Sequence, residues 1–296
     1  MTLPPDRGHI KTEQVHLETC DLDLLSTLDC VALLSKDHVN AIEAVQDASV
    51  AISTFIDALF TRVQAGGRLI YFGCGTSGRL GVLDAAECPP TFQSPPEMVI
   101  GLIAGGDASL RSSSEAKEDD SSGITSDFDR IELNTNDTVL GIAAGGTTPW
   151  VLGGIELARQ RGAMTGFLTC SEATPTVDHC ISLCTGPEPL TGSTRLKAGT
   201  ATKLALNIIT TTLFTKLGNV YGNMMVDLKA TNAKLLDRAI RIVSSVCEVE
   251  RETSALLLET SNGDVKCAIV MHKKSIDATQ ARELVQSTGG NLRAIL

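Results

Sequence analysis

The residues best suited to chemistry lie in short polar turns that follow apolar, strand-like runs. The first turn combines glycines with two hydroxyls and a cation: Gly75, Thr76, Ser77, Gly78 and Arg79. Free backbone N–H groups at a helix start, hydroxyl donors and the positive end of the helix dipole together attract an anion. The two hydroxyls favour a phosphate monoester. The Gly-x-Gly-x-x-Gly spacing alone would also fit a dinucleotide site or a tight turn that binds nothing.

Two further turns repeat this combination of residue types. Thr147 and Thr148 follow a glycine pair after the apolar run 139–143. The third turn precedes a long helical pattern and carries a carboxylate, two hydroxyls and two cations: Glu188, Ser193, Thr194, Arg195 and Lys197. Ligands of open α/β sheets bind where the strands end, so the three turns together predict a phosphate-ester site. Ordinary helix capping by solvated side chains is the alternative for each turn.

The carboxylates near these turns are typical of surface side chains when each is taken alone. Glu87 ends the predicted helix 75–87 and is followed by Cys88-Pro89-Pro90, which we expect to stop that helix. Glu118 belongs to an acidic run at the end of the predicted helix 110–118, a place where charges are usually solvated. The five histidines are dispersed and lack metal-ligand spacing, so the sequence predicts no metal site.

The apolar pattern predicts strands that alternate with helices. Strands are expected at 68–72, 98–103, 139–143, 165–169 and 181–184, and helices at 37–63, 75–87, 110–118, 149–161 and after 197. This alternation is typical of parallel β-α-β units, so we predict an α/β fold with a doubly wound parallel sheet flanked by helices. We expect three parts: an N-terminal segment that packs on the core (1–36), the sheet domain (37–222) and a small helical C-terminal domain (223–296).

The composition excludes several classes of protein. The 296 residues carry a formal net charge of −10 and only 3% aromatic residues, which argues against a nucleic-acid partner. The N-terminus is polar and broken by prolines, and no apolar run is long enough to span a bilayer, so we expect no secretory signal and no membrane partner. Nine scattered cysteines without a Cys-x-x-Cys pair are typical of reduced thiols in the cytoplasm.

In combination, these motifs resemble the sugar isomerase (SIS) domain of the N-acetylmuramic acid 6-phosphate etherase family. The stretches that carry the resemblance are 66–71, 75–92, 103–106, 192–200 and 220–227. The most specific part reads Gly-Thr-Ser-Gly-Arg-Leu-Gly-Val-Leu-Asp-Ala-Ala-Glu-Cys-Pro-Pro-Thr-Phe. A relative of the family, the glucokinase regulatory protein, shares the SIS motifs without being an enzyme. In its Glu-Cys-Pro-Pro-Thr segment, the present chain resembles the etherases and not the regulatory protein.

The resemblance implies an acid–base role for Glu87, and a second functional role for Glu118 in the family's Glu-Asp pair. It implies a lyase that opens the D-lactyl ether of N-acetylmuramic acid 6-phosphate by elimination and water addition, giving N-acetylglucosamine 6-phosphate and D-lactate. No metal or redox cofactor is implied, and the cleft is expected to be completed across a homodimer interface. A non-catalytic regulator that binds a sugar phosphate is the alternative. The chain has Gly145 and Thr147 where the family usually has serine and arginine.

Overall fold

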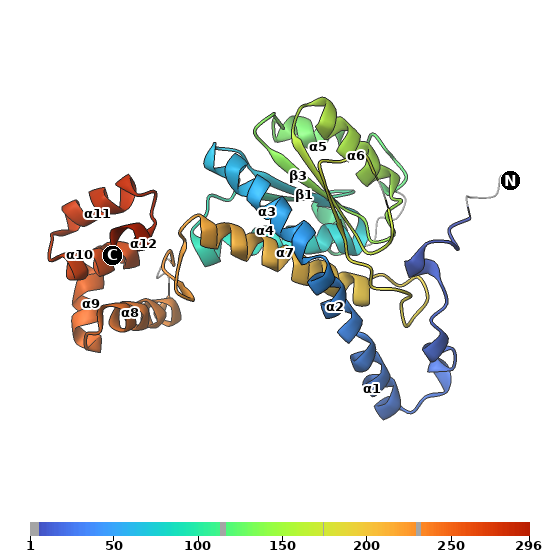
Figure 1. Cartoon of the computed structure of the whole chain (residues 1–296), viewed down its shortest axis with the longest axis horizontal. Coiled ribbons are helices and arrows are strands. Elements are labelled where there is room, and N and C mark those ends of the chain that lie inside the picture. The colour runs from blue at the N-terminus through green and yellow to red at the C-terminus, as the bar shows by residue number, and fades with distance from the viewer. Residues whose placement is uncertain (1–5, 113–116, 174, 229–231) are drawn as a thin grey trace. The chain divides into compact units, whose positions relative to one another are not determined.

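The computed structural model describes residues 6–112, 117–173, 175–228 and 232–296. Figure 1 shows a parallel sheet with helices on both faces, and further helices toward the C-terminus. Within the described ranges, no helix combines the length and the apolar character that a bilayer crossing requires.

Packing divides the chain into two compact units. The sheet unit combines Met1–Ala86 with Glu97–Ile209, and the second unit combines Glu87–Pro96 with Thr210–Leu296. The division therefore falls inside two helices, whereas the sequence analysis placed its boundary at residue 222. The limits of the three expected parts remain a prediction.

The sheet contains five parallel strands in the order β2-β1-β3-β4-β5. Their bounds are β1 (Leu69–Gly73), β2 (Val99–Ile103), β3 (Thr138–Ile142), β4 (Met164–Thr169) and β5 (His179–Ser182). Each strand lies within one or two residues of a predicted run, so the predicted doubly wound parallel sheet is confirmed. Gly73 pairs with Ile103 on one side and Ile142 on the other, so β1, β2 and β3 end at the same edge. The turns that follow them therefore meet there.

The sheet unit also contains the helices of the first two-thirds of the chain. The α-helices are α1 (Thr27–Asp37), α2 (Val39–Asp47), α3 (Ser49–Gln64), α4 (Gly75–Phe92), α5 (Thr125–Arg130), α6 (Pro149–Gln160) and α7 (Lys197–Lys216), of which α4 and α7 extend into the second unit. Short 3-10 turns accompany them, among them η1 (Lys11–Glu13), η2 (Leu17–Thr19), η3 (Leu22–Leu24) and η4 (Asp107–Leu110).

Adjacent residues of β1 anchor helices on the two faces of the sheet. Tyr71 faces α4, where a Cβ added at Gly81 would lie only 2.9 Å from the Tyr71 Cβ, so glycine allows the close approach of helix to strand. Phe72 faces the opposite way and contacts Phe128 of α5 and Trp150 of α6, with ring centroids 5.6 and 5.9 Å apart. All four aromatic side chains are buried, and their burial fixes both helical layers on the sheet.

The structure corrects the predicted end of α4. We expected Pro89 and Pro90 to stop this helix, but it continues to Phe92. The amide of Gln93 donates to the carbonyl of Pro89, which closes the last turn beyond the prolines. Phe92 also stacks on Phe214 of α7, with ring centroids 4.4 Å apart, and this packing stabilises the final turn.

Two other helix predictions are wrong. The predicted helix 37–63 is divided into α2 and α3, and Asp37 ends α1 instead of capping the helix that follows. The Asp37 carboxylate instead accepts hydrogen bonds from His16, Asn40 and Lys197. The predicted helix 110–118 is absent from its described part, because Leu110 ends the 3-10 turn η4 and a turn follows. Residues 113–116 of that prediction lie outside the described residues.

The second unit is helical, as predicted. It contains α8 (Ala233–Cys247), α9 (Arg251–Thr260), α10 (Val265–Lys274), α11 (Ala278–Ser287) and α12 (Leu292–Ile295), together with the hairpin strands β6 (Val220–Tyr221) and β7 (Met224–Met225). The apolar run 267–271 forms the buried centre of α10, around which the other helices pack. Lys266 at the start of α10 forms an ion pair with Asp227.

Candidate active site

A cavity of about 190 Å³ lies at the sheet edge where β1 and β3 end. Its floor includes Cys74 and Gly75, which follow β1, and Ala144 and Gly145, which follow β3. This is the position at which open parallel sheets bind their ligands. The cavity is polar, because hydroxyl side chains form much of its wall.

The structure brings five predicted hydroxyl residues to this cavity: Thr76, Ser77, Thr147, Thr148 and Thr194. The first two belong to the first turn of α4, whose N–H groups lack intrahelical acceptors and carry the positive end of the helix dipole. The turn around residue 147 precedes α6, and the third turn precedes α7. Three separate strand-to-helix connections therefore supply donors to one cavity.

Glu118 is the predicted carboxylate that lines the cavity. It lies close to the start of α4, since a Cβ added at Gly75 would be 3.3 Å from its Oε1 atom. Burial, together with the negative charge of Glu118, raises the pKa of the neighbouring Cys74 thiol to about 12. Cys74 therefore stays neutral at physiological pH and adds no charge to the cavity.

This protonation state predicts low reactivity for Cys74. With a pKa of about 12, roughly one thiol in ten thousand is a thiolate at pH 8, and only the thiolate reacts with alkylating agents. We expect iodoacetamide at pH 8 to modify the exposed Cys20 and Cys184 well before Cys74. Peptide mass spectrometry over a time course measures the three rates. Rapid labelling of Cys74 would contradict this assignment.

The structure does not bring all predicted anion-binding cations to the cavity. Arg79 points to η4 and the residues after it, where its guanidinium donates to the carbonyls of Leu110 (3.2 Å) and Ser109 (2.7 Å). Arg195 is exposed, and neither it nor Ser193 lines the cavity. Gly78 serves packing, because a side chain there would clash with the β1 backbone.

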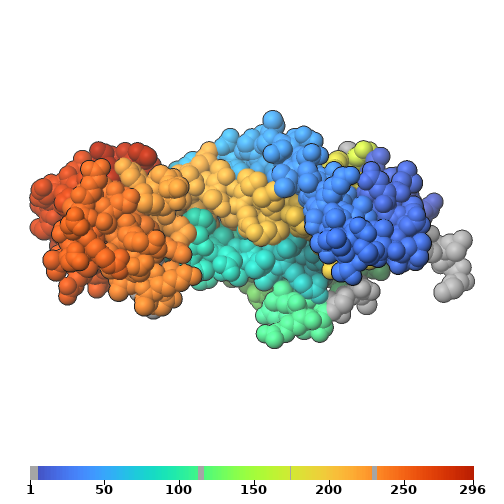
Figure 2. Space-filling view, turned by 90° about the horizontal axis from the view of Figure 1, so that it is seen from below, coloured from blue at the N-terminus to red at the C-terminus, as the bar shows by residue number. Residues whose placement is uncertain are grey.

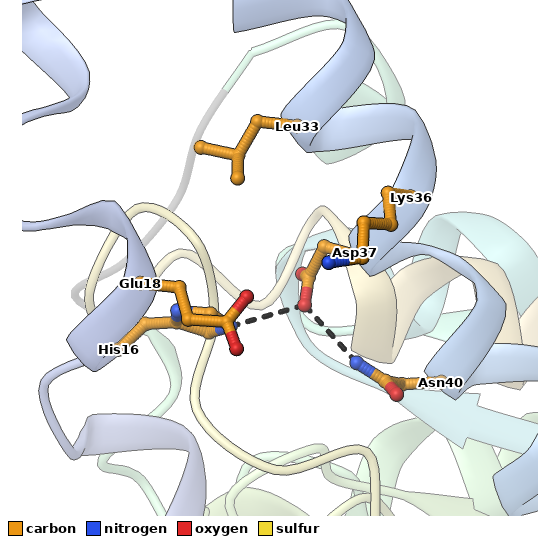
Figure 3. Close-up of a pocket in the computed structure, with 6 residues that line it drawn as sticks. All are labelled: His16, Glu18, Leu33, Lys36, Asp37 and Asn40. Carbon is orange, nitrogen blue, oxygen red and sulfur yellow. Dashed lines mark hydrogen bonds and ion pairs between the residues drawn. The ribbon is translucent and has the colours of Figure 1, made fainter.

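Lys197 and Glu188 also make structural contacts instead of lining the cavity. The Lys197 side chain is 1% exposed, and its Nζ atom donates to Asp37 Oδ1 at 2.9 Å. The same oxygen receives hydrogen bonds from His16 Nε2 (3.0 Å) and Asn40 Nδ2 (3.1 Å), as Figure 3 shows. This cluster is called the Asp37 cluster below.

The carboxylate of Glu188 caps the start of α7. It accepts the backbone N–H groups of Lys197 and Ala198, both at 2.9 Å. Burial raises the pKa of Glu188, an effect that these two donors oppose. The carboxylate thus satisfies two of the four donors that a helix start leaves open.

Glu87 belongs to the part of α4 that packing assigns to the second unit. It is exposed, and it does not line the cavity. It stands about three turns beyond Gly75 on α4. Of the two glutamates singled out in the sequence, the described chain therefore brings only Glu118 to the hydroxyl residues.

Three cavity residues come from a part of the chain in which the sequence predicted no site residue: Arg7, Ile10 and Glu13. They belong to the N-terminal segment, which we expected only to pack on the core. No strand-turn-helix pattern marks this segment, and its approach to the cavity depends on contacts with residues far along the chain. The described residues contain no group of three or more His, Cys, Asp or Glu side chains that could hold a metal ion.

Two protein-family models match the chain. Residues 51–159 match the glucokinase regulatory protein N-terminal SIS domain, and residues 222–265 match the C-terminal lid domain of glucokinase regulatory protein. The first match covers β1 to β3 and the helices between them, including the start of α4 and the turn before α6.

Relatives that match nearly the whole chain identify its family more directly. The chain is 49% identical to the N-acetylmuramic acid 6-phosphate etherase of Parasynechococcus marenigrum, over 97% of this chain and 92% of the relative. It is 50% identical to the enzyme of the same name from a Nostoc species, over 97% and 95% of the two chains. The chain belongs to the N-acetylmuramic acid 6-phosphate etherase family. The family resemblance seen in the sequence motifs is therefore confirmed.

The fold of this etherase-family chain agrees with a solved structure of low sequence identity. A candidate phosphosugar isomerase of Bacteroides fragilis superposes with a TM-score of 0.50, covering 67% of this chain and 95% of the other at 17% identity. This likeness confirms the SIS-type fold class.

Proposed function

We propose that the protein is a carbon–oxygen lyase that cleaves the D-lactyl ether of N-acetylmuramic acid 6-phosphate. The observation that carries the proposal is identity of about half, over nearly the whole chain, to relatives that bear the etherase name. The cavity supports it, because the wall of hydroxyls and helix N–H groups suits a phosphate monoester and Glu118 supplies a carboxylate beside it.

The reaction requires proton transfers that carboxyl groups can perform. In the open-chain form of the sugar, C2 is next to the aldehyde carbonyl, so a positioned carboxylate can remove its proton. The C3–oxygen bond then breaks, and the lactyl oxygen takes a proton and leaves as the hydroxyl of D-lactate. Water adds to C3 of the unsaturated aldehyde, and a proton returns to C2. The products are D-lactate and N-acetylglucosamine 6-phosphate.

Glu87 and Glu118 are the residues proposed for these transfers. Two carboxyl groups in different surroundings can hold different pKa values, so that one acts as acid and the other as base. Glu118 lies in the cavity, whereas Glu87 is exposed. We therefore propose that the protein is a homodimer in which Glu87 of each chain reaches the cavity of the other chain.

Exposed apolar side chains support the homodimer. Several large hydrophobic residues near the N-terminus are more than half exposed: Leu17, Leu24, Leu28 and Val31. Such a concentration on one segment is typical of surfaces that become covered by another chain. We also propose a cytoplasmic location, which fits the free cysteines.

The experiment that tests the function is a D-lactate assay on the purified full-length protein. Incubation with N-acetylmuramic acid 6-phosphate should release D-lactate and N-acetylglucosamine 6-phosphate in equal amounts. A protein whose melting temperature rises with the sugar phosphate, but which releases no lactate, would instead be a binding regulator.

A further inference from the structure

Arg7 is the only basic side chain among the described residues that line the cavity. Two carboxylates, Glu13 and Glu118, share that lining. A sugar phosphate would bring further negative charge beside them. Hydroxyls and helix N–H groups offer hydrogen bonds and partial charges, whereas Arg7 alone offers a full positive charge in the lining.

The segment that carries Arg7 packs against the loops that form the cavity. Thr12 is fully buried and Ile10 is 6% exposed. Gly145 lies next to this pair, since a Cβ added there would be 3.8 Å from Thr12 Oγ1 and 3.9 Å from Ile10 Cγ2. On the other side, a Cβ at Gly192 would be 3.0 Å from Glu13 Oε2. The segment thus lies between the second and third turns.

The Asp37 cluster anchors the other end of the segment. His16 Nε2 bonds to Asp37, which pairs with Lys197 at the first position of α7. In Figure 2, blue residues from the N-terminal part of the chain adjoin the gold of α7, in agreement with the bond from Lys197 to Asp37. The anchor connects the N-terminal segment directly to the helix that follows the third turn. The segment that carries Arg7 is therefore held by the buried Ile10 and Thr12, while Arg7 itself is exposed.

We propose that Arg7 forms an ion pair with an anionic group of the sugar phosphate, and that the contact between His16 and Asp37 positions the segment for this. The inference rests on the proposed function and adds a specificity residue to it. The substrate has two anionic groups, its phosphate and its lactyl carboxylate. Arginine binds either one through two parallel N–H donors. N-Acetylglucosamine 6-phosphate has only the phosphate, so comparing the two ligands distinguishes a contact with the phosphate from a contact with the lactyl carboxylate.

The test compares Arg7→Ala with Lys11→Ala in the full-length protein. Lys11 is an exposed cation on the same segment that does not line the cavity, so it controls for net charge. Calorimetry measures the Kd of each variant for N-acetylglucosamine 6-phosphate, and lactate assays measure KM and kcat with N-acetylmuramic acid 6-phosphate. We expect Arg7→Ala to raise the affected constants about ten- to a hundredfold, the usual size for a lost charged hydrogen bond.

The two ligands identify the group that Arg7 binds. A rise in both Kd and KM assigns Arg7 to the phosphate, and a rise in KM alone assigns it to the lactyl carboxylate. Values equal to those of Lys11→Ala would overturn the inference while leaving the proposed function intact. Wild-type protein that neither binds the phosphate sugar nor releases lactate would overturn both.

A second variant tests the anchor. His16→Ala changes none of the residues that line the cavity but removes the bond to Asp37. We expect it to raise KM as Arg7→Ala does, with kcat little changed, because the interaction lost is one of binding. An unchanged KM would show that the segment holds its position without His16.

Discussion

Mixing Glu87→Gln and Glu118→Gln chains is expected to restore the lactate release that neither variant shows alone. Removing one acid–base group lowers the rate of such reactions by about two to four orders of magnitude, so each variant alone should be nearly inactive. Glu118 lines the cavity and Glu87 is exposed. If each site takes one glutamate from each chain, a mixed dimer contains one intact site and one doubly altered site.

The recovered activity has an expected size. Random reassociation makes half of the dimers mixed, and half of their sites are intact, so about a quarter of the wild-type activity should return. Co-expression of differently tagged chains produces the mixed dimers for a D-lactate assay. Asp119→Asn is the matched control, because this exposed neighbour does not line the cavity. Inactive mixed dimers would show that both glutamates act within one chain.

Lys197→Met is expected to destabilise the sheet unit by about 3 to 5 kcal/mol, the usual result when a buried ion pair loses one partner. Methionine retains the apolar length of the side chain but leaves the Asp37 carboxylate, whose side chain is 6% exposed, without the lysine charge. Urea unfolding followed by Trp150 fluorescence measures the free energy of unfolding of this unit. Trp150 is the only tryptophan and is buried on α6.

Two further variants separate charge from packing. Lys203→Met changes an exposed lysine on the same helix and should alter the stability by less than about 0.5 kcal/mol. Adding Asp37→Asn to Lys197→Met removes the carboxylate that has lost its lysine partner, so the double variant should be more stable than Lys197→Met alone. A Lys197→Met protein as stable as wild type would mean that the pair contributes nothing net.

The strands of the sheet could be predicted because each is a short apolar run bounded by turns. The run 68–72 became β1 (Leu69–Gly73) and the run 139–143 became β3 (Thr138–Ile142). Helix ends were harder to predict. The continuation of α4 through two prolines depends on the stack of Phe92 on Phe214, a contact between residues more than a hundred positions apart. A prediction based on neighbouring residues in the sequence cannot include such a distant contact.

The candidate site shows the same difference between local and distant determinants. Thr76 and Ser77 could be placed at the cavity because the strand-turn-helix pattern itself positions them. Arg79 and Lys197 have the right charge at the right place in the sequence, but their long side chains reach other partners. Arg7 could not be found, because its segment approaches the cavity through contacts with residues that fold into place from far along the chain.

The anchored N-terminal segment has a practical consequence for how the protein is produced. An affinity tag fused ahead of Met1 would be separated from Arg7 by only six residues. Even fully extended, the intervening residues place the end of such a tag within about 25 Å of Arg7. Recombinant protein intended for kinetic work should therefore carry its tag after Leu296, or have an N-terminal tag removed before assay.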